Sequence, residues 1–333
     1  MVSESRTVRF LRRVVKKKSL WVVALVLAFV WFNNSSLFVG ERDGKATIVA
    51  HAALGQSYDL KGVKWNTNTA AIIHTPEHNY IENTLPSMQA AFAYGADIVE
   101  FDVRLTGDKQ LAVFHDDILA YRTNAKGPVS AFTMEQLRHI DVGYGYTADG
   151  GQTYPLRGTG IGLMVSIDDV FRRFPNGKFL IHIKDGGSQI GPILLKFLST
   201  RDASEIENIS VYGNDVALNL LRERYPRMKL LSAGKIKRAL LSYELIGWTG
   251  IVPGPMRNME LHFPVRYAKF LWGWPNRFLQ RMNAVNSRVV LVQYVDGWSD
   301  GFDSRADLEM LPKGYTGAVW TNRVDIIGPL LKE

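Results

Sequence analysis

Two acidic residues interrupt a stretch of sequence that otherwise has the composition of a buried strand. In DIVEFDVRL, residues 97–105, side chains alternate between two faces, so Glu100 and Asp102 share one face while Phe101 lies on the other. On a two-layer sheet that charged face would point into solvent. Inside a parallel barrel the two carboxylates would need a neutralising charge, and carboxylate oxygens are preferred ligands of hard divalent cations. If the strand lies in a parallel barrel, the two acids therefore predict a metal site.

Ionisable side chains also mark the ends of neighbouring predicted strands. The run TIVAH ends in His51, the run LAVFHDD contains His115, and the run FLIHIKD places His182 and Lys184 on one face. A cation, a lysine and two histidines can transfer a phosphoryl group, because the positive charges neutralise the phosphate while the histidines act as base and acid. The chain contains no cysteine, so a metal must be held by oxygen or imidazole ligands.

The elements that would position these residues follow a regular alternation. After residue 45, short β-branched runs alternate with amphipathic segments, which predicts crossover connections and a mainly parallel sheet. About eight strands over a chain of this length indicate an α/β fold of the (β/α)8 TIM-barrel type, with its active site at the C-terminal ends of the strands. The predicted strands are TIVAH, DIVEFDV, LAVFHD, KFLIHIKD, NISVYG, KLLSAG, RVVLVQYV and GAVWTNR.

Two irregular segments stand outside this alternation. Residues 52–81 are predicted to form a long polar loop, and such loops in compact domains are often lids or binding loops. Residues 261–282 concentrate aromatic side chains and arginines, which suits a membrane interface, an element that covers the substrate, or a core helix with a basic outer face.

The N-terminal segment differs in composition from the rest of the chain. Residues 1–18 contain seven Lys or Arg and one acid, which accounts for +6 of the net charge of +8. The nearly neutral remainder shows no basic stripe with interleaved aromatic side chains, so no nucleic-acid partner is expected. Residues 20–39 are uncharged, and about 20 such residues suffice to span a bilayer.

These features predict a membrane protein with a single pass. We expect a basic cytoplasmic N-terminus at residues 1–19, a transmembrane signal-anchor helix at residues 20–40, and a catalytic barrel at residues 45–333 on the outer, periplasmic or extracellular side. The alternative is that the apolar run is a buried core helix.

Several motifs, in order, resemble the glycerophosphodiester phosphodiesterase family. The family pattern runs His-Arg-Gly, Glu-Asn-Thr, Gly-Ala-Asp-x-x-Glu-x-Asp-Val and His-Asp, and the matching stretches are VAHAALG, IENTLPSMQAAFAYGADIVEFDV and VFHDD. The similarity extends through FLIHIKD to GYTGAVWTNR and covers most of residues 47–325. The resemblance implies a phosphatidylinositol-phosphodiesterase-like TIM barrel that uses a divalent metal, magnesium or calcium.

The resemblance also implies roles for individual residues. It assigns acid/base catalysis to two histidines, metal binding to three side chains and substrate binding to three more, namely His51 and His115; Glu100, Asp102 and His182; and Lys184, Glu82 and Asn83. In the family scheme a histidine activates a substrate hydroxyl beside the phosphate. The hydroxyl displaces the alcohol, and a cyclic phosphate forms and then opens.

Two positions depart from the family pattern. Ala52 replaces the arginine that follows the first histidine, and His182 replaces a glutamate that is usually the third metal ligand. Imidazole in place of a carboxylate favours manganese or zinc over calcium. The long loop offers His74, Glu77 or His78 as a substitute ligand.

The predicted function is hydrolysis of glycerophosphodiesters or lysophospholipids to an alcohol and a glycerol phosphate product. One alternative is a phospholipase of the sphingomyelinase D type. Another, motivated by Ala52 and His182, is a barrel with impaired catalysis that binds a phospholipid headgroup or a protein partner.

Overall fold

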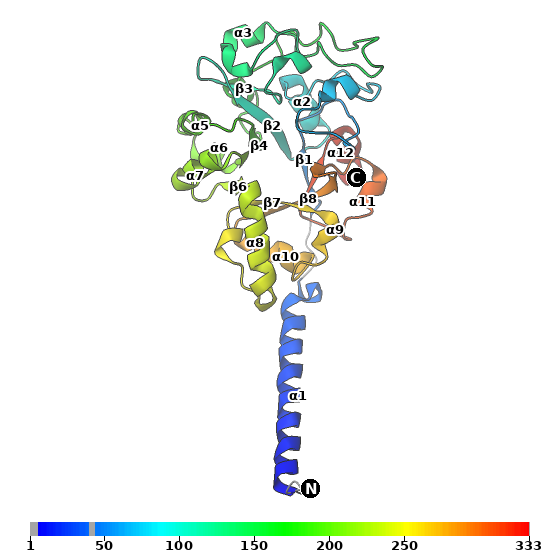
Figure 1. Ribbon diagram of the computed structural model, residues 1–333, viewed down its shortest axis with the longest axis vertical. Helices are drawn as coiled ribbons and strands as arrows, with labels where there is room; N and C mark the ends of the chain where they lie inside the picture. Colours follow the sequence, from blue (N-terminus) through cyan, green and yellow to red (C-terminus); the bar gives the residue numbers. More distant parts are fainter. Residues whose placement is uncertain (1–5, 40–43, 333) are drawn as a thin grey trace.

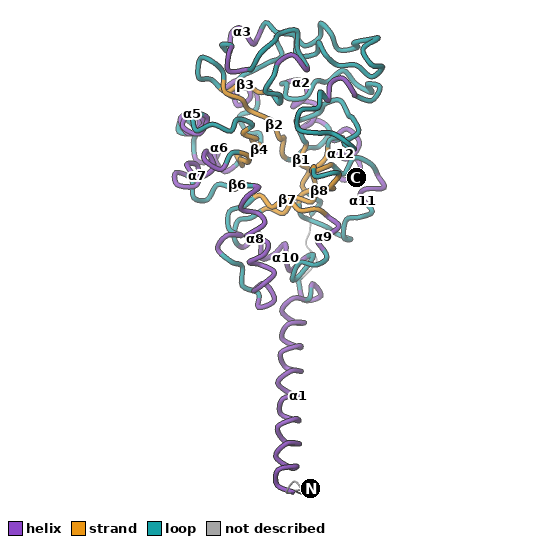
Figure 2. Tube along the Cα trace, viewed as in Figure 1, coloured by secondary structure: helices purple, strands orange, loops and turns teal. Residues whose placement is uncertain are grey.

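Eight parallel strands form a barrel at the centre of the protein (Figures 1 and 2). The computed structural model describes residues 6–39 and 44–332, with the backbone alone for residues 6–17. The barrel strands are β1 Thr47–Ala50, β2 Ile98–Leu105, β4 Phe179–Ile183, β5 Ile209–Gly213, β6 Lys229–Leu231, β7 Glu260–Pro264, β8 Arg288–Val295 and β10 Ala318–Thr321.

The strand order closes on itself. Hydrogen-bonded neighbours follow the path β6-β5-β4-β2-β1-β10-β8-β7, and a parallel bridge between Leu230 and Met259 joins β6 to the residue before β7. This topology agrees with the predicted (β/α)8 barrel. The pairing between β6 and β7 is the weakest in the ring, because a single bridge joins them.

The two faces of each strand bury different groups. On β2, Phe101 and its outward neighbours pack against the surrounding helices, whereas Ile98 packs inside the barrel with Leu180 of β4. Glu100 and Asp102 follow Ile98 on the inward face, and both are fully buried. The inward face therefore changes from apolar to charged towards the C-terminal ends of the strands.

Helices cover the outside of the barrel and return the chain to the start of the next strand. They begin at residues suited to helix starts, as where Thr84 caps α2 and Ser166 caps α4 through capping boxes. The helices after the N-terminal one are α2 Leu85–Ala93, α3 Met134–Arg138, α4 Ile167–Arg173, α5 Ile190–Leu198, α6 Ala203–Glu207, α7 Asp215–Arg224, α8 Ala233–Ile246, α9 Val265–Ala268, α10 Asn276–Ala284, α11 Arg305–Leu308 and α12 Val324–Lys332.

Two strand predictions were wrong. The run LAVFHD forms β3, Leu111–Val113, which pairs antiparallel with the end of β2 and is not a barrel strand. The eighth barrel strand is β7, which overlaps the start of the aromatic and basic segment 261–282. Its residues ELHFP alternate, but the strand was missed because the run is short, ends in Pro264 and leads into aromatic and basic residues. A second hairpin strand, β9 Trp298–Asp300, pairs antiparallel with β8.

The N-terminal helix α1, Arg6–Asn34, projects away from the barrel (Figure 1). Its C-terminal end is fastened by Arg281 of α10, whose guanidinium donates hydrogen bonds to the Asn33 carbonyl at 2.8 Å and to Asn34 Oδ1 at 3.0 Å. The predicted helix at residues 20–40 was too long at this end, because a 3-10 turn at Ser36–Phe38 follows. Among the described residues, no helix combines the length and apolarity needed to cross a membrane.

The segment at residues 52–81 is a long connection, as predicted. Its one short helical element in the described chain is a 3-10 turn at Thr69–Ile72. Hydrogen bonds from Gln56 to the His78 and Tyr80 carbonyls, at 2.9 Å and 2.7 Å, hold the two ends of this loop together beside the barrel mouth.

Candidate active site

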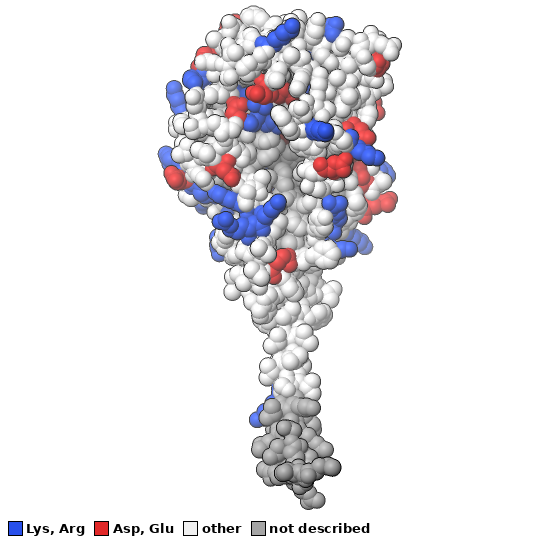
Figure 3. Space-filling model, in the orientation of Figure 1, with Lys and Arg blue, Asp and Glu red and all other residues white. Residues whose placement is uncertain are grey.

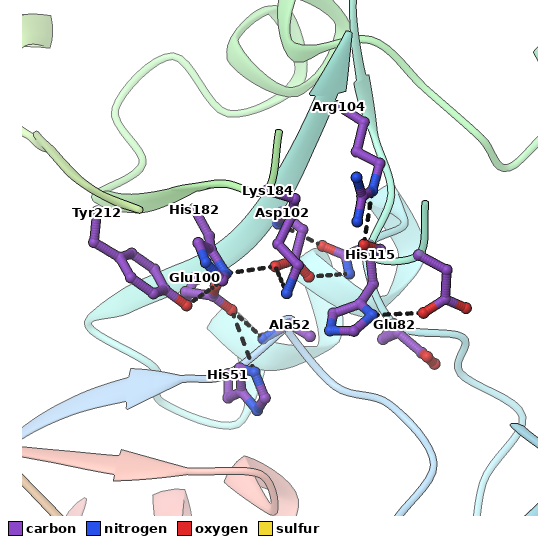
Figure 4. Close-up of polar contacts among 12 residues, drawn as sticks. His51, Ala52, Glu82, Glu100, Asp102, Arg104, His115, His182, Lys184 and Tyr212 are labelled. Atoms are coloured by element: carbon purple, nitrogen blue, oxygen red, sulfur yellow. Dashed lines mark hydrogen bonds and ion pairs between the residues drawn. The ribbon is translucent and has the colours of Figure 1, made fainter. Parts of the chain in front are cut away.

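Two carboxylates and an imidazole converge inside the barrel (Figure 4). Glu100 and Asp102 extend from β2, and His182 extends from β4, where the register pairs it with Asp102. One ligand atom from each of the three side chains lies within 4.8 Å of the others. His182 Nδ1 is 2.9 Å from Asp102 Oδ1 and 3.9 Å from Glu100 Oε1. The β2–β4 pairing therefore places the three predicted metal ligands together.

Further hydrogen bonds fix both carboxylates. The Tyr212 hydroxyl of β5 donates to Glu100 Oε1 at 2.6 Å, and the Ala52 backbone N–H donates to Glu100 Oε2 at 2.6 Å. The Asn83 side-chain amide donates to Asp102 Oδ2 at 2.8 Å, and its oxygen accepts from the Asp102 backbone at 2.9 Å. These contacts hold the two acids in place before any cation binds.

The surroundings shift the pKa values of the two acids in opposite directions. Burial and the charge of Asp102 raise the pKa of Glu100 to about 7. Burial also opposes ionisation of Asp102, but Lys184 and the neighbouring histidines lower the pKa of Asp102 well below its usual range. Lys184 Nζ lies 3.5 Å from Asp102 Oδ1. Burial lowers the pKa of His182 to about 4, so its imidazole is neutral near neutral pH. A neutral imidazole is the form that binds metals.

The donor set fits a divalent cation. Each carboxylate oxygen has two lone pairs, so a ligand position remains after the hydrogen bonds described above. The charge of a cation would offset the cost of burying two acids side by side. The loop side chains suggested as substitutes bond elsewhere: His74 to Ser57 at 3.1 Å, His78 to Gln56 at 3.2 Å, and Glu77 to Arg323. None of the three is part of the cluster.

His51 follows β1 and faces the acid pair. Its Nε2 atom lies 4.0 Å from Glu100 Oε2, and its Nδ1 atom lies 2.7 Å from Asn322 Oδ1 at the end of β10. The ring packs against Trp320 with a centroid distance of 4.7 Å. His51 is thus held on two sides while its Nε2 edge points toward the metal ligands.

His115 reaches the site from the loop after β3 rather than from a barrel strand. Its Nδ1 atom lies 2.6 Å from Asp116 Oδ1, and Arg122 Nε lies 3.0 Å from Asp116 Oδ2. Glu82 Oε1 lies 3.3 Å from the same Arg122 nitrogen. Glu82, which the family resemblance assigns to substrate binding, therefore lies on the side of the pocket that holds His115.

The backbone at Ala52 and Ala53 adopts an uncommon conformation. Ala52 and Ala53 have φ angles of 48° and 69°, in the left-handed region that L-residues rarely adopt. This turn aims the Ala52 N–H at Glu100 and allows the Ala52 carbonyl to accept from the Asn83 N–H at 3.0 Å. Ala52 itself offers no guanidinium to a phosphate at the position where the family pattern has arginine.

Several functional neighbours were missed in the sequence. Tyr212 stacks on His182 with a centroid distance of 3.9 Å and an interplanar angle of 15°, in addition to bonding Glu100. Asn322 and Asp116 occur in the runs GAVWTNR and LAVFHDD without a predicted role. All three stand at or just beyond strand ends, so the rule applied to the histidines would have found Tyr212 in NISVYG and Asn322 in AVWTN.

Comparison with known proteins finds a family match over part of the chain. Residues 76–211 match the model of the glycerophosphoryl diester phosphodiesterase family. A putative glycerophosphodiester phosphodiesterase of Bacillus subtilis is 35% identical over 112 residues, which cover 33% of this chain and 42% of that protein. A lysophospholipase D of Mus musculus is 26% identical over 210 residues, 59% of this chain and 60% of that protein. The matches thus span less than two thirds of these relatives.

Solved structures share the fold at low sequence identity. The glycerophosphoryl diester phosphodiesterase domain of an uncharacterised Mycobacterium tuberculosis protein superposes with a TM-score of 0.59 and 15% identity, covering 86% of this chain and 99% of that one. A phosphodiesterase of Oleispira antarctica, solved in complex with sn-glycerol-3-phosphate, gives 0.54 and 15%, covering 86% and 97%. The sequence match and the shared barrel agree, and the matched part of the chain, residues 76–211, belongs to the glycerophosphoryl diester phosphodiesterase family.

Proposed function

We propose that this chain is a metal-dependent phosphodiesterase that hydrolyses glycerophosphodiesters or lysophospholipids to an alcohol and a glycerol phosphate product. The observation that carries the proposal is the convergence of His51 and His115 on the buried pair Glu100 and Asp102. Burying this pair costs free energy that a purely structural barrel would avoid with apolar residues. Perturbed carboxylates beside histidines at the mouth of a barrel are typical of catalytic sites.

Three residues would hold the cation: Glu100, Asp102 and His182. When bound, a divalent cation neutralises a phosphodiester and polarises its phosphorus–oxygen bonds. Lys184, which already lies beside Asp102, adds a second positive charge on the same side of the pocket. The positive charges would stabilise the oxygens on which negative charge grows during transfer.

Two histidines can move the protons that the reaction requires. One ring accepts the proton of a glycerol hydroxyl adjacent to the phosphate as that oxygen bonds to phosphorus. The bond between phosphorus and the alcohol oxygen breaks, and the other ring donates a proton to that oxygen. Water then opens the cyclic phosphate with the proton transfers reversed, so atoms and charges balance and both rings return to their starting states.

The substrate class follows from this chemistry and from the relatives. A hydroxyl next to the phosphate is present in glycerophosphodiesters and in lysophospholipids that carry a free glycerol hydroxyl. The similarity to a lysophospholipase D supports including the second class.

We further propose that the apolar side chains of α1 attach the protein to a membrane. Its side chains at Leu20, Trp21 and Leu25 are 68%, 71% and 69% exposed. On the face shown in Figure 3, the tapered end of the barrel that leads into α1 carries few charged residues. The double substitution Leu25→Glu/Leu27→Glu should move the protein from the membrane fraction to the supernatant. A wild-type chain found only in the supernatant would contradict this proposal.

The decisive experiment for the activity is turnover with controlled metal. Release of choline or glycerol 3-phosphate would be measured with glycerophosphocholine and lysophosphatidylcholine, after chelation and after addition of magnesium, calcium, manganese or zinc separately. Metal-dependent hydrolysis of either substrate supports the proposal. Turnover of sphingomyelin instead would favour the sphingomyelinase D-type alternative.

Ala52 and His182 favour a second candidate, a barrel that binds a phospholipid headgroup or a protein partner without hydrolysing it. Absence of turnover with all four metals, together with saturable binding of glycerophosphocholine or of a protein partner, would establish this candidate and reject the phosphodiesterase.

A further inference from the structure

A side-chain amide sits between His51 and two acidic residues. Asn322 Oδ1 faces His51 Nδ1 at 2.7 Å. On its other side, the Asn322 Nδ2 group donates to Asp300 Oδ1 at 3.0 Å and to Asp303 Oδ2 at 2.7 Å. The two acids come from the end of β9 and the segment that follows it, so the β8–β9 hairpin reaches across to the end of β10.

This arrangement fixes which way the Asn322 amide points. An ionised carboxylate only accepts hydrogen bonds, so the side of the amide that faces two carboxylates must be its NH₂ group. The opposite side, which faces His51, must then be the carbonyl oxygen. A carbonyl oxygen only accepts, and the His51 Nδ1 atom beside it must carry the proton.

The segment is built closely around this amide. Asp303 Oδ1 also accepts from the Asn322 backbone N–H at 2.7 Å and from the Thr321 hydroxyl at 3.0 Å. A Cβ atom at Gly301 would lie 2.8 Å from Asn322 Nδ2 and 2.7 Å from the Asn322 backbone nitrogen, so no larger residue fits there without displacing it. Burial raises the pKa of both carboxyls, with their mutual repulsion contributing at Asp300, so placing two acids here has a cost in stability.

We propose that Asp300 and Asp303 are positioning residues that, through Asn322, hold His51 in the tautomer with its proton on Nδ1. The Nε2 lone pair then faces the acid pair and the substrate and is free to accept a proton. The catalytic consequence of this arrangement rests on the proposed phosphodiesterase function, whereas the tautomer itself does not.

The tautomer can be measured directly by ¹⁵N NMR of the imidazole in the full-length chain without metal, at a pH where His51 is neutral. We expect a protonated Nδ1 and an unprotonated Nε2. In Asp300→Asn/Asp303→Asn, both acceptors can become donors, the Asn322 amide is free to turn, and the Nε2-protonated form should appear. Adding Asn322→Asp to that variant restores an acceptor toward His51 and should return the original tautomer.

Activity provides the second readout. We expect kcat of Asp300→Asn/Asp303→Asn to fall by about 10- to 100-fold with a smaller change in KM, and the added Asn322→Asp to recover at least part of the loss. Asp296→Asn is the matched control, because Asp296 lies at the turn of the same hairpin and its carboxylate accepts from the Gly62 N–H. It should leave the His51 tautomer unchanged.

Two results would overturn the proposal: protonated Nε2 in the wild-type protein, or an unchanged tautomer in a folded Asp300→Asn/Asp303→Asn variant. If that variant does not fold, the wild-type spectrum alone still decides the question. A correct tautomer in a chain that hydrolyses neither substrate would reject the phosphodiesterase function and leave the assignment of the amide standing.

Discussion

The Nδ1 atom of His115 lies 2.6 Å from the Oδ1 atom of Asp116, so a histidine proposed to act in catalysis is oriented by the residue that directly follows it. Because an ionised carboxylate only accepts hydrogen bonds, Nδ1 carries the proton and Nε2 is left to the substrate. Arg122 holds the second oxygen of the same carboxylate and prevents it from turning away.

Replacing this carboxylate should impair chemistry more than binding. We expect Asp116→Asn to lower kcat by about 10- to 100-fold with a smaller change in KM, because the amide can present a donor to Nδ1 and favour the wrong tautomer. Asp117→Asn is the matched control, since the Asp117 side chain is 74% exposed and does not contact His115. Equal effects of the two substitutions on kcat would contradict the role of Asp116.

Removal of either proposed acid/base group should abolish most turnover while leaving the fold intact. His51→Ala and His115→Ala are each expected to reduce kcat by on the order of 10²- to 10⁴-fold. The two side chains are 30% and 39% exposed, so little packing is lost, and urea unfolding should change only slightly. His139→Ala, at an exposed position, provides the control. Unaltered turnover in either active-site variant would remove that histidine from the mechanism.

The identity of the third metal ligand should set metal preference. His182→Glu restores the carboxylate of the family pattern and adds a negative charge, so we expect tighter binding of magnesium and calcium relative to manganese and zinc. His182→Gln has the same length as glutamate without the charge. Calorimetric titration of each metal into the two variants would separate the effect of the ligand charge from the effect of side-chain length. A preference that is identical in both variants would show that the ligand charge at this position does not control selectivity.

A structural carboxylate away from the site should make stability depend on pH. Partial burial of Asp169 opposes its ionisation, but hydrogen bonds from the Ser166 backbone and from Arg138 lower the pKa of Asp169 to about 2. This pKa lies below the ordinary value of 3.8, so ionised Asp169 stabilises the folded state fully above pH 3.8. The stabilisation is lost as the pH falls through about 2.

We therefore expect Asp169→Asn to lower the free energy of unfolding by about 1 kcal/mol at neutral pH, the usual contribution of a helix cap, and by less near pH 2. Urea unfolding of both proteins across this range measures the difference. Asp168→Asn, one residue earlier and 57% exposed, should show a smaller effect at neutral pH. A difference between Asp169→Asn and wild type that does not shrink on acidification would refute the assignment.

The alternation of strands and the clustering of ionisable groups at their ends were predictable from the sequence. The period of two in IVEFDVRL places Glu100 and Asp102 on the inward face, and the same period in FLIHI places His182 beside them. These are local properties of extended chains. The family resemblance implied His182 as the third ligand, and the pairing of β2 with β4 brings it beside Glu100 and Asp102.

The remaining features depend on contacts between distant segments. The alternation of side chains along a strand does not predict the antiparallel pairing of β3 with β2. It also does not predict the hydrogen bond between Asn322 and His51. Strand β7 contains a proline and a histidine in a segment rich in aromatic side chains, and its strand conformation is imposed by pairing with β8. Tertiary context decided these elements, as it commonly does for short strands.

The single bridge between Leu230 and Met259 has a consequence for local unfolding. The strand path ends at β6 and β7, while β2 and β1, which present Glu100, Asp102 and His51, occupy its middle. Few backbone hydrogen bonds need to break for the ring to open at its ends, so amide hydrogens near this bridge should exchange with solvent sooner than those of β2. The barrel can therefore open locally between β6 and β7, and this opening leaves Glu100 and Asp102 of β2 side by side.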